Sequence, residues 1–122
     1  QLAKLVGCHV IALTGADSKV ELLRALGADR VVNYRRENLA DVLAREYPRG
    51  IDIAYDSVGG GIFDTFLEHL AMRGRLVISG HTSDFERPED ELVPQPRIYR
   101  KLYWKSASIR GFLNPMYPEY FE

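Results

Sequence analysis

Short apolar runs alternate along this chain with segments in which apolar residues recur every three or four positions. The first pattern is typical of β-strands and the second of amphipathic α-helices. Five apolar runs bounded by turn-forming residues are predicted to be strands: His9–Thr14, Arg30–Asn33, Ile51–Asp56, Arg75–Ser79 and Ser106–Phe112. Most of these runs are nearly continuous, which predicts parallel strands that are covered on both faces.

Helices are predicted between these strands. The first begins near Asp17 and Ser18, where Ser18 and Glu21 have the spacing of a capping box, and it ends at Gly27. Further helices are predicted over Leu39–Tyr47, Gly60–Met72 and Arg97–Trp104. The apolar stripes that we expect to pack in the core are Val20, Leu23 and Leu26; Leu39, Val42 and Leu43; and Ile62, Phe63, Phe66, Leu67 and Leu70.

This alternation of strand and helix favours an α/β fold with a doubly wound parallel sheet and right-handed crossovers. Such sheets bind ligands at the carboxyl ends of their strands, so the residues that follow each strand are the candidates for function. The regular pattern stops at His81–Pro96, which contains three prolines and a cluster of acids. We therefore predict a long surface loop whose part from Pro88 to Pro96 is mobile.

Composition narrows the range of partners. The chain has the size of one domain, and its 16 basic and 17 acidic residues give a net charge of -1. That balance argues against binding to nucleic acid or to an anionic membrane. The single Cys8 has no partner for a disulfide, no Cys/His group has zinc-site spacing, and no apolar run approaches the ~20 residues of a membrane span. Partners must therefore be inferred from local sites.

Several motifs follow one another in an order that identifies a family. They are "GADSK" (Gly15–Lys19), "LGADRVVNYR" (Leu26–Arg35), "IDIAYDSVGG" (Ile51–Gly60), "GRLVISG" (Gly74–Gly80) and "KSASIRGFLN" (Lys105–Asn114). Together they resemble the quinone-oxidoreductase-like branch of the medium-chain dehydrogenase/reductases. Within that branch they are most similar to the prostaglandin and leukotriene reductases, and the last run resembles the zinc-binding alcohol dehydrogenase domain-containing protein 2 group, also called prostaglandin reductase 3.

The resemblance implies that residues 1–122 are part of a Rossmann-type dinucleotide-binding domain. In such proteins the central strand and its glycine-rich, phosphate-binding turn precede the segment matched by Gln1–Cys8. The resemblance also places the catalytic substrate domain outside this sequence. We therefore expect a gap of roughly 10 Å between His9–Thr14 and Ile51–Asp56, because strands lie ~4.8 Å apart in a sheet.

The end of the first predicted strand indicates which cofactor is bound. A protein selective for NAD usually places an acid there to accept the ribose hydroxyls, whereas this strand ends in Thr14 and Gly15. Small residues followed by Ser18 and Lys19 suit a 2′-phosphate, which favours NADP. Alternatively, Ser18 only caps its helix and Lys19 is a surface charge. Asp17 is the alternative acceptor that would favour NAD.

The resemblance assigns further cofactor contacts. It implies that Lys19 and Tyr34 bind the 2′-phosphate, that Ser57 and Val58 lie beside the ribose, that Gly80 and His81 lie beside the nicotinamide end, that Tyr99 is near the nicotinamide ribose, and that Phe112, Leu113 and Asn114 pack against the nicotinamide. Each has a simpler alternative, namely a tight turn, a solvated side chain or core packing. No proton donor is assigned, because Phe85 stands where related reductases have a tyrosine.

The implied activity is hydride transfer from NADPH to the C=C bond of an α,β-unsaturated ketone, without zinc. A quinone oxidoreductase that uses the same cofactor is the first alternative, and a dinucleotide-sensing or interaction domain without chemistry is the second. The expected partners are a small enone or quinone and, in the full-length protein, a second copy in a homodimer. The expected compartment is the cytoplasm, with the peroxisome and the mitochondrion as alternatives.

Overall fold

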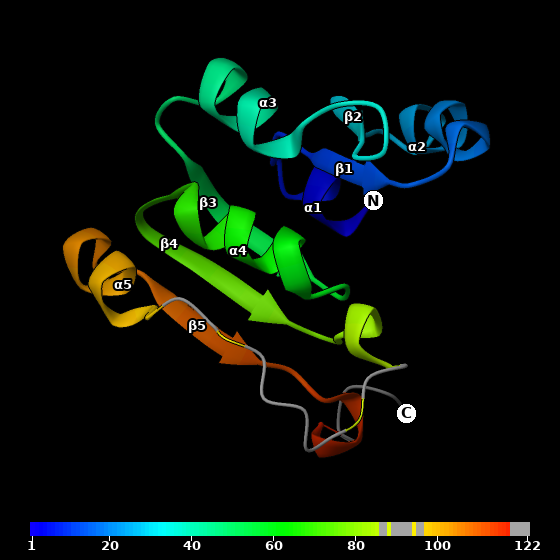
Figure 1. Cartoon of the computed structure of the whole chain (residues 1–122). Helices are drawn as coiled ribbons and strands as arrows, with labels where there is room; N and C mark the ends of the chain where they lie inside the picture. The colour runs from blue at the N-terminus through cyan, green and yellow to red at the C-terminus, as the bar shows by residue number, and fades with distance from the viewer. Residues whose placement is uncertain (86–87, 89–93, 95–96, 118–122) are drawn as a thin grey trace. The chain divides into compact units, whose positions relative to one another are not determined.

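The computed structural model describes residues 1–85, 88, 94 and 97–117, in which helices and strands alternate along the chain (Figure 1). The strands are β1 (Ile11–Thr14), β2 (Arg30–Asn33), β3 (Ile51–Asp56), β4 (Leu70–Ile78) and β5 (Ser108–Gly111). The α-helices are α1 (Leu2–Leu5), α2 (Val20–Ala25), α3 (Leu39–Glu46), α4 (Gly60–Glu68) and α5 (Tyr99–Lys105). Short 3-10 helices form at η1 (Asp17–Lys19), η2 (Thr82–Asp84) and η3 (Asn114–Met116).

The chain divides into two compact units, unit 1 over Gln1–Val42 and unit 2 over Leu43–Glu122. Unit 1 contains a two-stranded sheet of order β1-β2, and unit 2 contains a three-stranded sheet of order β3-β4-β5. Every pair in these sheets is parallel, which confirms the predicted α/β class. Strands β1 and β3 belong to different sheets, and the expected 10 Å gap between them stays a prediction.

Unit 1 has a small buried centre. Strand β2 supplies buried Val31 and Val32, and the side chains of Leu39 and Val42 on α3 are buried as well. Helix α2 contributes no buried residue, and its Leu22 and the C-cap residue Leu26 are exposed. The expectation that the stripe of this helix packs in the core is therefore wrong for Leu26. A helix of six residues presents too little surface to bury a full stripe against a two-stranded sheet.

Unit 2 is built around a hydrophobic cluster of Ala54, Leu67, Leu70 and Leu76, against which Phe63, Phe66, Leu102 and Ile109 pack. Because the cluster joins strand residues to side chains of α4 and α5, these helices cover the same face of the sheet (Figure 1). On β3 the alternate residues Ile53 and Tyr55 are exposed. The prediction of strands covered on both faces is therefore wrong for β3 within the described residues. The predicted bounds of this strand are nevertheless the observed ones.

The largest difference in element bounds concerns the start of β4. The sequence pattern predicts helix through Met72, whereas α4 ends at Glu68 and β4 begins at Leu70. Leu70 pairs with Ile51, and the register then shifts so that Arg75 pairs with Ile53. Gly50 permits this early pairing, because a Cβ there would lie 2.7 Å from the backbone of Ala71. Long-range strand pairing therefore overrides the local helical periodicity.

The other bounds agree with the sequence pattern to within a few residues, and β2 and β3 agree at both ends. Most of the predicted loop over Pro88–Pro96 lies outside the described residues, so its mobility stays a prediction. None of the helices in the described ranges has the length and apolar character needed to cross a lipid bilayer.

Candidate functional site

The carboxyl end of β1 is a tight turn that brings the chain against the end of β2. The Thr14 hydroxyl oxygen accepts a hydrogen bond of 3.0 Å from the Ala16 amide, which bends the backbone around Gly15. A Cβ on Gly15 would lie 2.7 Å from the hydroxyl oxygen of Tyr34 and 3.2 Å from Nε of Arg35. Glycine at this position leaves room for the ends of both side chains, which an added Cβ would displace.

The end of β2 supplies the facing half of the site. Thr14 and Asn33 are partners in the parallel register, and the Tyr34 amide donates a 3.1 Å hydrogen bond to the Thr14 carbonyl oxygen. The Arg35 amide donates to Oδ1 of Asn33 at 3.1 Å. These bonds hold the backbone of Tyr34 and Arg35 beside Gly15. The structure thus brings Tyr34, which the resemblance assigned to the 2′-phosphate, next to the predicted site.

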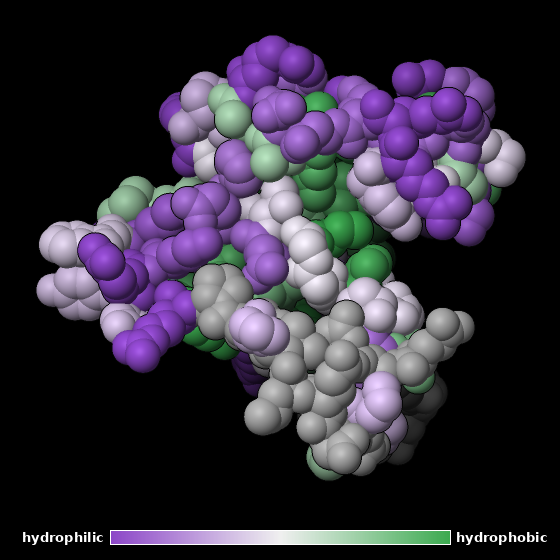
Figure 2. All heavy atoms as spheres, in the orientation of Figure 1, coloured by the Kyte–Doolittle hydropathy of each residue, from purple (hydrophilic) through white to green (hydrophobic). Residues whose placement is uncertain are grey.

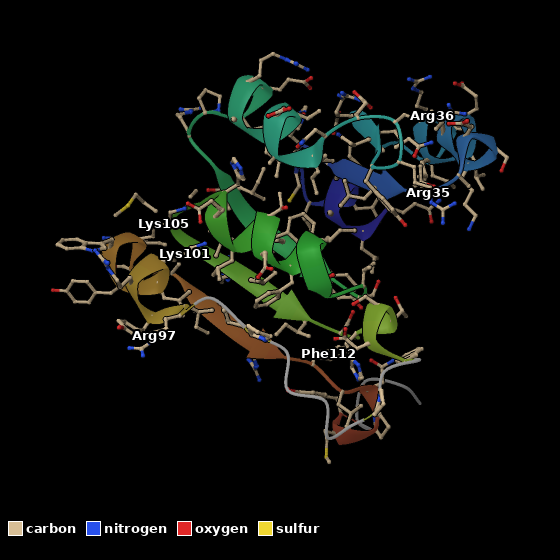
Figure 3. All side chains as sticks on the ribbon, viewed as in Figure 1. Arg35, Arg36, Arg97, Lys101, Lys105 and Phe112 are labelled. Carbon is tan, nitrogen blue, oxygen red and sulfur yellow. The ribbon has the colours of Figure 1, made fainter. Side chains whose placement is uncertain are left out.

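Two arginines at this edge were missed in the sequence analysis. Arg35 packs against Gly15, and Arg36 follows it in the same loop after β2 (Figure 3). The signal was present as the basic pair directly after Tyr34, but adjacent loop arginines are ordinarily solvated surface charges. Around η1 and α2, in the upper right of Figure 2, the visible face is mainly hydrophilic.

Asp17 does not stand free at this edge. Its Oδ1 accepts a 2.5 Å hydrogen bond from the buried Asn33 side-chain amide, and its Oδ2 accepts one of 2.8 Å from Arg36. The hydrogen bond from Arg36 is the main cause that holds the pKa of the Asp17 carboxyl below its ordinary value, against partial desolvation. The carboxylate that could have favoured NAD is therefore ionised and already occupied.

Ser18 and Lys19 lie on η1, and both are exposed. Neither η1 nor α2 has a side-chain hydrogen bond at its N-cap, so the predicted capping box of Ser18 and Glu21 is wrong. Helix α2 begins after Lys19, which leaves Ser18 inside the preceding 3-10 turn, where a capping geometry does not form. The Lys19 amide donates a 3.1 Å hydrogen bond to the Ala16 carbonyl oxygen, and its exposed side chain leaves the ammonium group accessible to a ligand.

In unit 2 the turn after β3 is organised by one buried carboxylate. Asp56 is 1% exposed, and its carboxylate accepts hydrogen bonds from the amides of Val58 at 2.8 Å and Gly59 at 3.1 Å. These bonds fix the backbone of Ser57 and Val58 at the carboxyl end of the strand. Gly59, with a φ of 81°, then opens α4. Asp56 therefore pairs with the backbone of its own turn.

The turn after β3 lies directly beside the turn after β4. The Ser79 amide donates to the Asp56 carbonyl oxygen at 2.7 Å, and the Ser83 amide donates to that of Val58 at 2.8 Å. A Cβ on Gly80 would lie 3.0 Å from the Ser57 carbonyl oxygen, so glycine permits this close approach. The structure therefore brings together Ser57, Val58, Gly80 and His81. His81 is exposed, and its ring meets Phe85 edge-on at 5.3 Å.

The end of β5 joins the same edge of the sheet. The Phe112 amide donates a 2.7 Å hydrogen bond to the Ile78 carbonyl oxygen, and the Phe112 ring stacks on Tyr117 at 5.1 Å. Leu113 is exposed, and Asn114 starts η3. The three residues assigned to the nicotinamide thus follow the strand at its carboxyl end, beside the end of β4.

Tyr99 is not brought to that edge. It begins α5, whose Lys101 forms an ion pair with Glu68 and whose Lys105 donates to the Glu68 carbonyl oxygen at 2.5 Å. Glu68 ends α4 immediately before β4, so these contacts place α5 near the starts of β4 and β5 (Figures 1 and 3). The assignment of Tyr99 to the nicotinamide ribose stays a prediction, and the geometry of α5 does not support it.

The described residues contain no group of three or more His, Cys, Asp or Glu side chains arranged to hold a metal ion. The edges described above are instead formed by backbone turns, hydroxyl groups and cations. Hydroxyl groups and cations are donors that suit phosphate oxygens.

Comparisons with known proteins agree with this interpretation of the fold. A family model described as zinc-binding dehydrogenase matches residues 1–122. Prostaglandin reductase-3 from Mus musculus is 42% identical over 122 residues, which cover 98% of this chain and 32% of the relative. The 2-alkenal reductase (NADP(+)-dependent) of Nicotiana tabacum is 34% identical over 128 residues, covering 100% of this chain and 36% of the relative.

Among solved structures, CurA from Vibrio vulnificus in complex with NADPH matches with a TM-score of 0.78 and 28% identity. The match covers 91% of this chain and 34% of that one. The chain therefore spans about a third of the length of the relatives that it matches.

Proposed function

Because this chain belongs to the family of zinc-binding dehydrogenases, we propose that it is part of the cofactor-binding domain of an NADPH-dependent reductase. The proposed reaction reduces the C=C bond of an α,β-unsaturated ketone. Relatives named prostaglandin reductase and NADP(+)-dependent 2-alkenal reductase support this class of reaction. The observation that carries the proposal is the polar edge at the ends of β1 and β2.

That edge suits a 2′-phosphate better than a free ribose. Gly15 leaves the Tyr34 hydroxyl group and the Arg35 guanidinium group against the turn, and Lys19 adds a third donor on η1. Cationic donors form charge-assisted hydrogen bonds with phosphate oxygens. The Asp17 carboxylate already accepts hydrogen bonds from Asn33 and Arg36. It is therefore not available at this turn to accept the ribose hydroxyls of NADH.

Unit 2 contains the residues that we propose for the ribose and the nicotinamide. Ser57, Val58 and Gly80 present backbone rather than bulky side chains at the ends of β3 and β4, which would let a ribose and a nicotinamide approach. Phe112 and Leu113 would supply an apolar wall at the end of β5. When bound, NADPH would supply a hydride to the β-carbon of the enone, and protonation of the α-carbon would complete the reduction.

Orientation is therefore the contribution of this chain to the reaction. The turns that would face the cofactor are fixed by backbone hydrogen bonds and by the buried Asp56 carboxylate rather than by flexible side chains. Holding the reacting atoms at a fixed distance is one of the largest sources of rate enhancement. We further propose that the activity needs no zinc and that the full-length protein is a homodimer in the cytoplasm.

Turnover by the full-length protein tests this proposal. We expect NADPH oxidation with an α,β-unsaturated ketone, one molecule of NADPH per reduced C=C bond, measured by cofactor absorbance and product mass. Oxidation with quinones but not with enones would favour a quinone oxidoreductase. Tight NADPH binding without turnover of either substrate would favour a dinucleotide-sensing domain. Activity that survives dialysis against a chelator is expected, and its loss would contradict the zinc-independent mechanism.

A further inference from the structure

Asp17 occupies a position from which a carboxylate could act on the cofactor. It is separated from the end of β1 by only Gly15 and Ala16, close to where NAD-selective proteins place an acid for the ribose hydroxyls. Its own carboxylate is nevertheless turned to Asn33 and Arg36. A carboxylate that could favour NADH is thus present in the chain, but it is hydrogen-bonded to Asn33 and Arg36.

The two partners of Asp17 are anchored differently. Asn33 is the last residue of β2 and is buried, and its side chain bridges two segments: Nδ2 donates to Asp17 and Oδ1 accepts from the Arg35 amide. Arg36 is held by its own backbone, since its amide donates to the Asn33 carbonyl oxygen at 2.9 Å. Asp17 therefore links the segment after β1 to the end of β2. Its contact with the buried Asn33 is fixed by the fold, and its contact with Arg36 is ionic.

The ionic contact is exposed, with 71% of the Arg36 side chain and 61% of the Asp17 side chain accessible to solvent. Exposed ion pairs add little to folding stability because water and salt screen them. A role in stability therefore does not explain the arrangement well. The contact does, however, decide whether a negative charge at this edge is paired or free.

We propose that Asn33 and Arg36 form a clamp that withholds the Asp17 carboxylate from the cofactor, so that preference for NADPH over NADH depends on Arg36. This inference rests on the proposed NADPH-dependent function. Arg36 acts here through Asp17 and is a positioning residue. Without the clamp, the carboxylate would accept hydroxyls of the NADH ribose and would repel the 2′-phosphate of NADPH, so both effects shift selectivity in the same direction.

The test measures Kd for NADPH and NADH in the full-length protein by fluorescence titration, with wild type, Arg36→Gln, Asp17→Asn and the double variant. In Arg36→Gln we expect NADH to bind more tightly, by about threefold to tenfold, which corresponds to one net hydrogen bond. NADPH should bind more weakly. Removing the carboxylate as well should return NADH affinity to the wild-type value, and Asp17→Asn alone should not tighten NADH binding.

A matched control is Arg24→Gln, which removes an exposed arginine of α2 that pairs with Glu21 instead of Asp17. It should leave the ratio of the two Kd values unchanged. Thermal unfolding of every variant checks that the fold persists, and because the readout is a ratio, a general loss of binding does not mimic the expected result.

Each other outcome has a distinct meaning. Equal wild-type affinity for NADPH and NADH would overturn the proposed cofactor itself, before any variant is considered. A selective wild type whose ratio is unchanged by Arg36→Gln would overturn only the clamp. If Arg36→Gln weakens NADPH without tightening NADH, and Asp17→Asn does not reverse the change, Arg36 binds the phosphate directly and the clamp is also overturned.

Discussion

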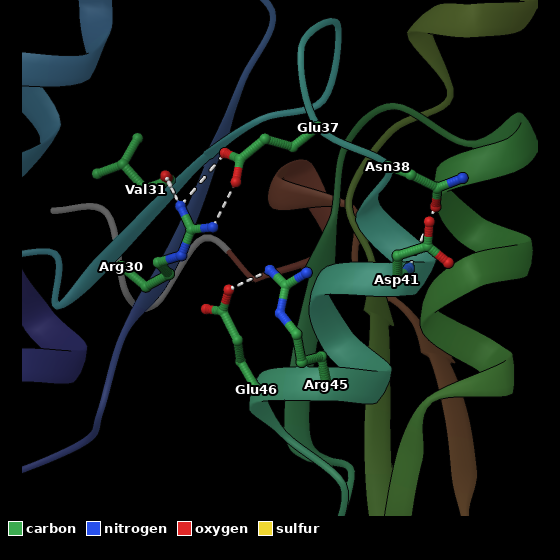
Figure 4. Close-up of polar contacts among 7 residues, drawn as sticks. All are labelled: Arg30, Val31, Glu37, Asn38, Asp41, Arg45 and Glu46. Carbon is green, nitrogen blue, oxygen red and sulfur yellow. Dashed lines mark hydrogen bonds and ion pairs between the residues drawn. The ribbon is translucent and has the colours of Figure 1, made fainter.

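Units 1 and 2 differ in how well their helices are packed and in the contacts that connect their elements. In unit 1, α2 buries no residue, Leu22 and Leu26 are 57% and 42% exposed, and side-chain ion pairs connect the elements. One of these pairs joins Arg30 to Glu37 at 2.5 Å (Figure 4). In unit 2 a continuous hydrophobic cluster supports three paired strands, and backbone hydrogen bonds join the turns at their ends.

The difference suits the two kinds of contact that we propose. A phosphate is recognised by charges that can be changed without disturbing a core, whereas hydride transfer requires reacting atoms to be held at a fixed distance. Charged turns on a lightly packed unit allow cofactor preference to vary. A packed sheet protects the geometry of the nicotinamide end. Substitutions in the two units should therefore fail in different ways.

The largest expected effect comes from the core of unit 2. Leu76 is fully buried on β4 within the hydrophobic cluster, and Leu76→Ala removes its packing and leaves a cavity. We expect the free energy of unfolding to fall by about 2–5 kcal/mol, measured by urea denaturation. The matched variant Leu26→Ala in unit 1 removes an exposed leucine and should cost much less. Comparable losses from the two variants would contradict the contrast between the units.

An intermediate effect, on binding rather than on folding, is expected at Lys19. The variant Lys19→Ala removes the proposed charge-assisted hydrogen bond between the ammonium group and the 2′-phosphate. Such a bond is worth about 1.5–3 kcal/mol, so NADPH affinity should fall about tenfold to a hundredfold. NADH affinity and the unfolding free energy should stay near their wild-type values. Titration with both cofactors measures the effect, and Tyr34→Phe should act in the same direction but more weakly. An equal loss for both cofactors would leave Lys19 as a surface charge.

Local patterns predicted unit 1 and unit 2 to different extents. The bounds of β2 and β3 were predicted at both ends, because each strand coincides with a short run rich in apolar residues that turn-forming residues bound. The start of β4 was not predicted. Leu67 and Leu70 have helical spacing, and only the pairing with Ile51 makes Leu70 part of a strand. That pairing depends on residues 19 positions away, which local periodicity does not report.

The candidate site shows the same limit. Tyr34 could be assigned from the motif that contains it, and the structure places it beside Gly15. The position of Arg35 and the ion pair between Arg36 and Asp17 could not be predicted. A charged residue in a loop sequence does not indicate which residue it will pair with. The failed capping box at Ser18 has a related cause, since spacing alone does not distinguish a 3-10 turn from the first turn of an α-helix.

The smallest expected effect tests the polar ties of unit 1. The Asp29 carboxylate accepts hydrogen bonds from the Val10 amide at 2.6 Å and from the Lys4 ammonium at 2.9 Å. The Val10 amide first, and then Lys4, hold the pKa of Asp29 below its ordinary 3.8. A carboxyl group with a lower pKa in the folded state stabilises the fold above its unfolded pKa, and this contribution disappears as the pH falls through the folded pKa.

Asp29→Asn should therefore lower the thermal midpoint near neutral pH by less than Leu76→Ala does, because the tie is exposed to solvent. The difference between wild type and variant should then shrink as the pH is lowered below about 4, where the wild-type carboxyl group begins to take up a proton. Asp52→Asn, at an exposed position of β3, is the control and should follow the wild-type curve. A difference at Asp29 that does not change with pH would mean that its carboxylate charge does not hold unit 1 together.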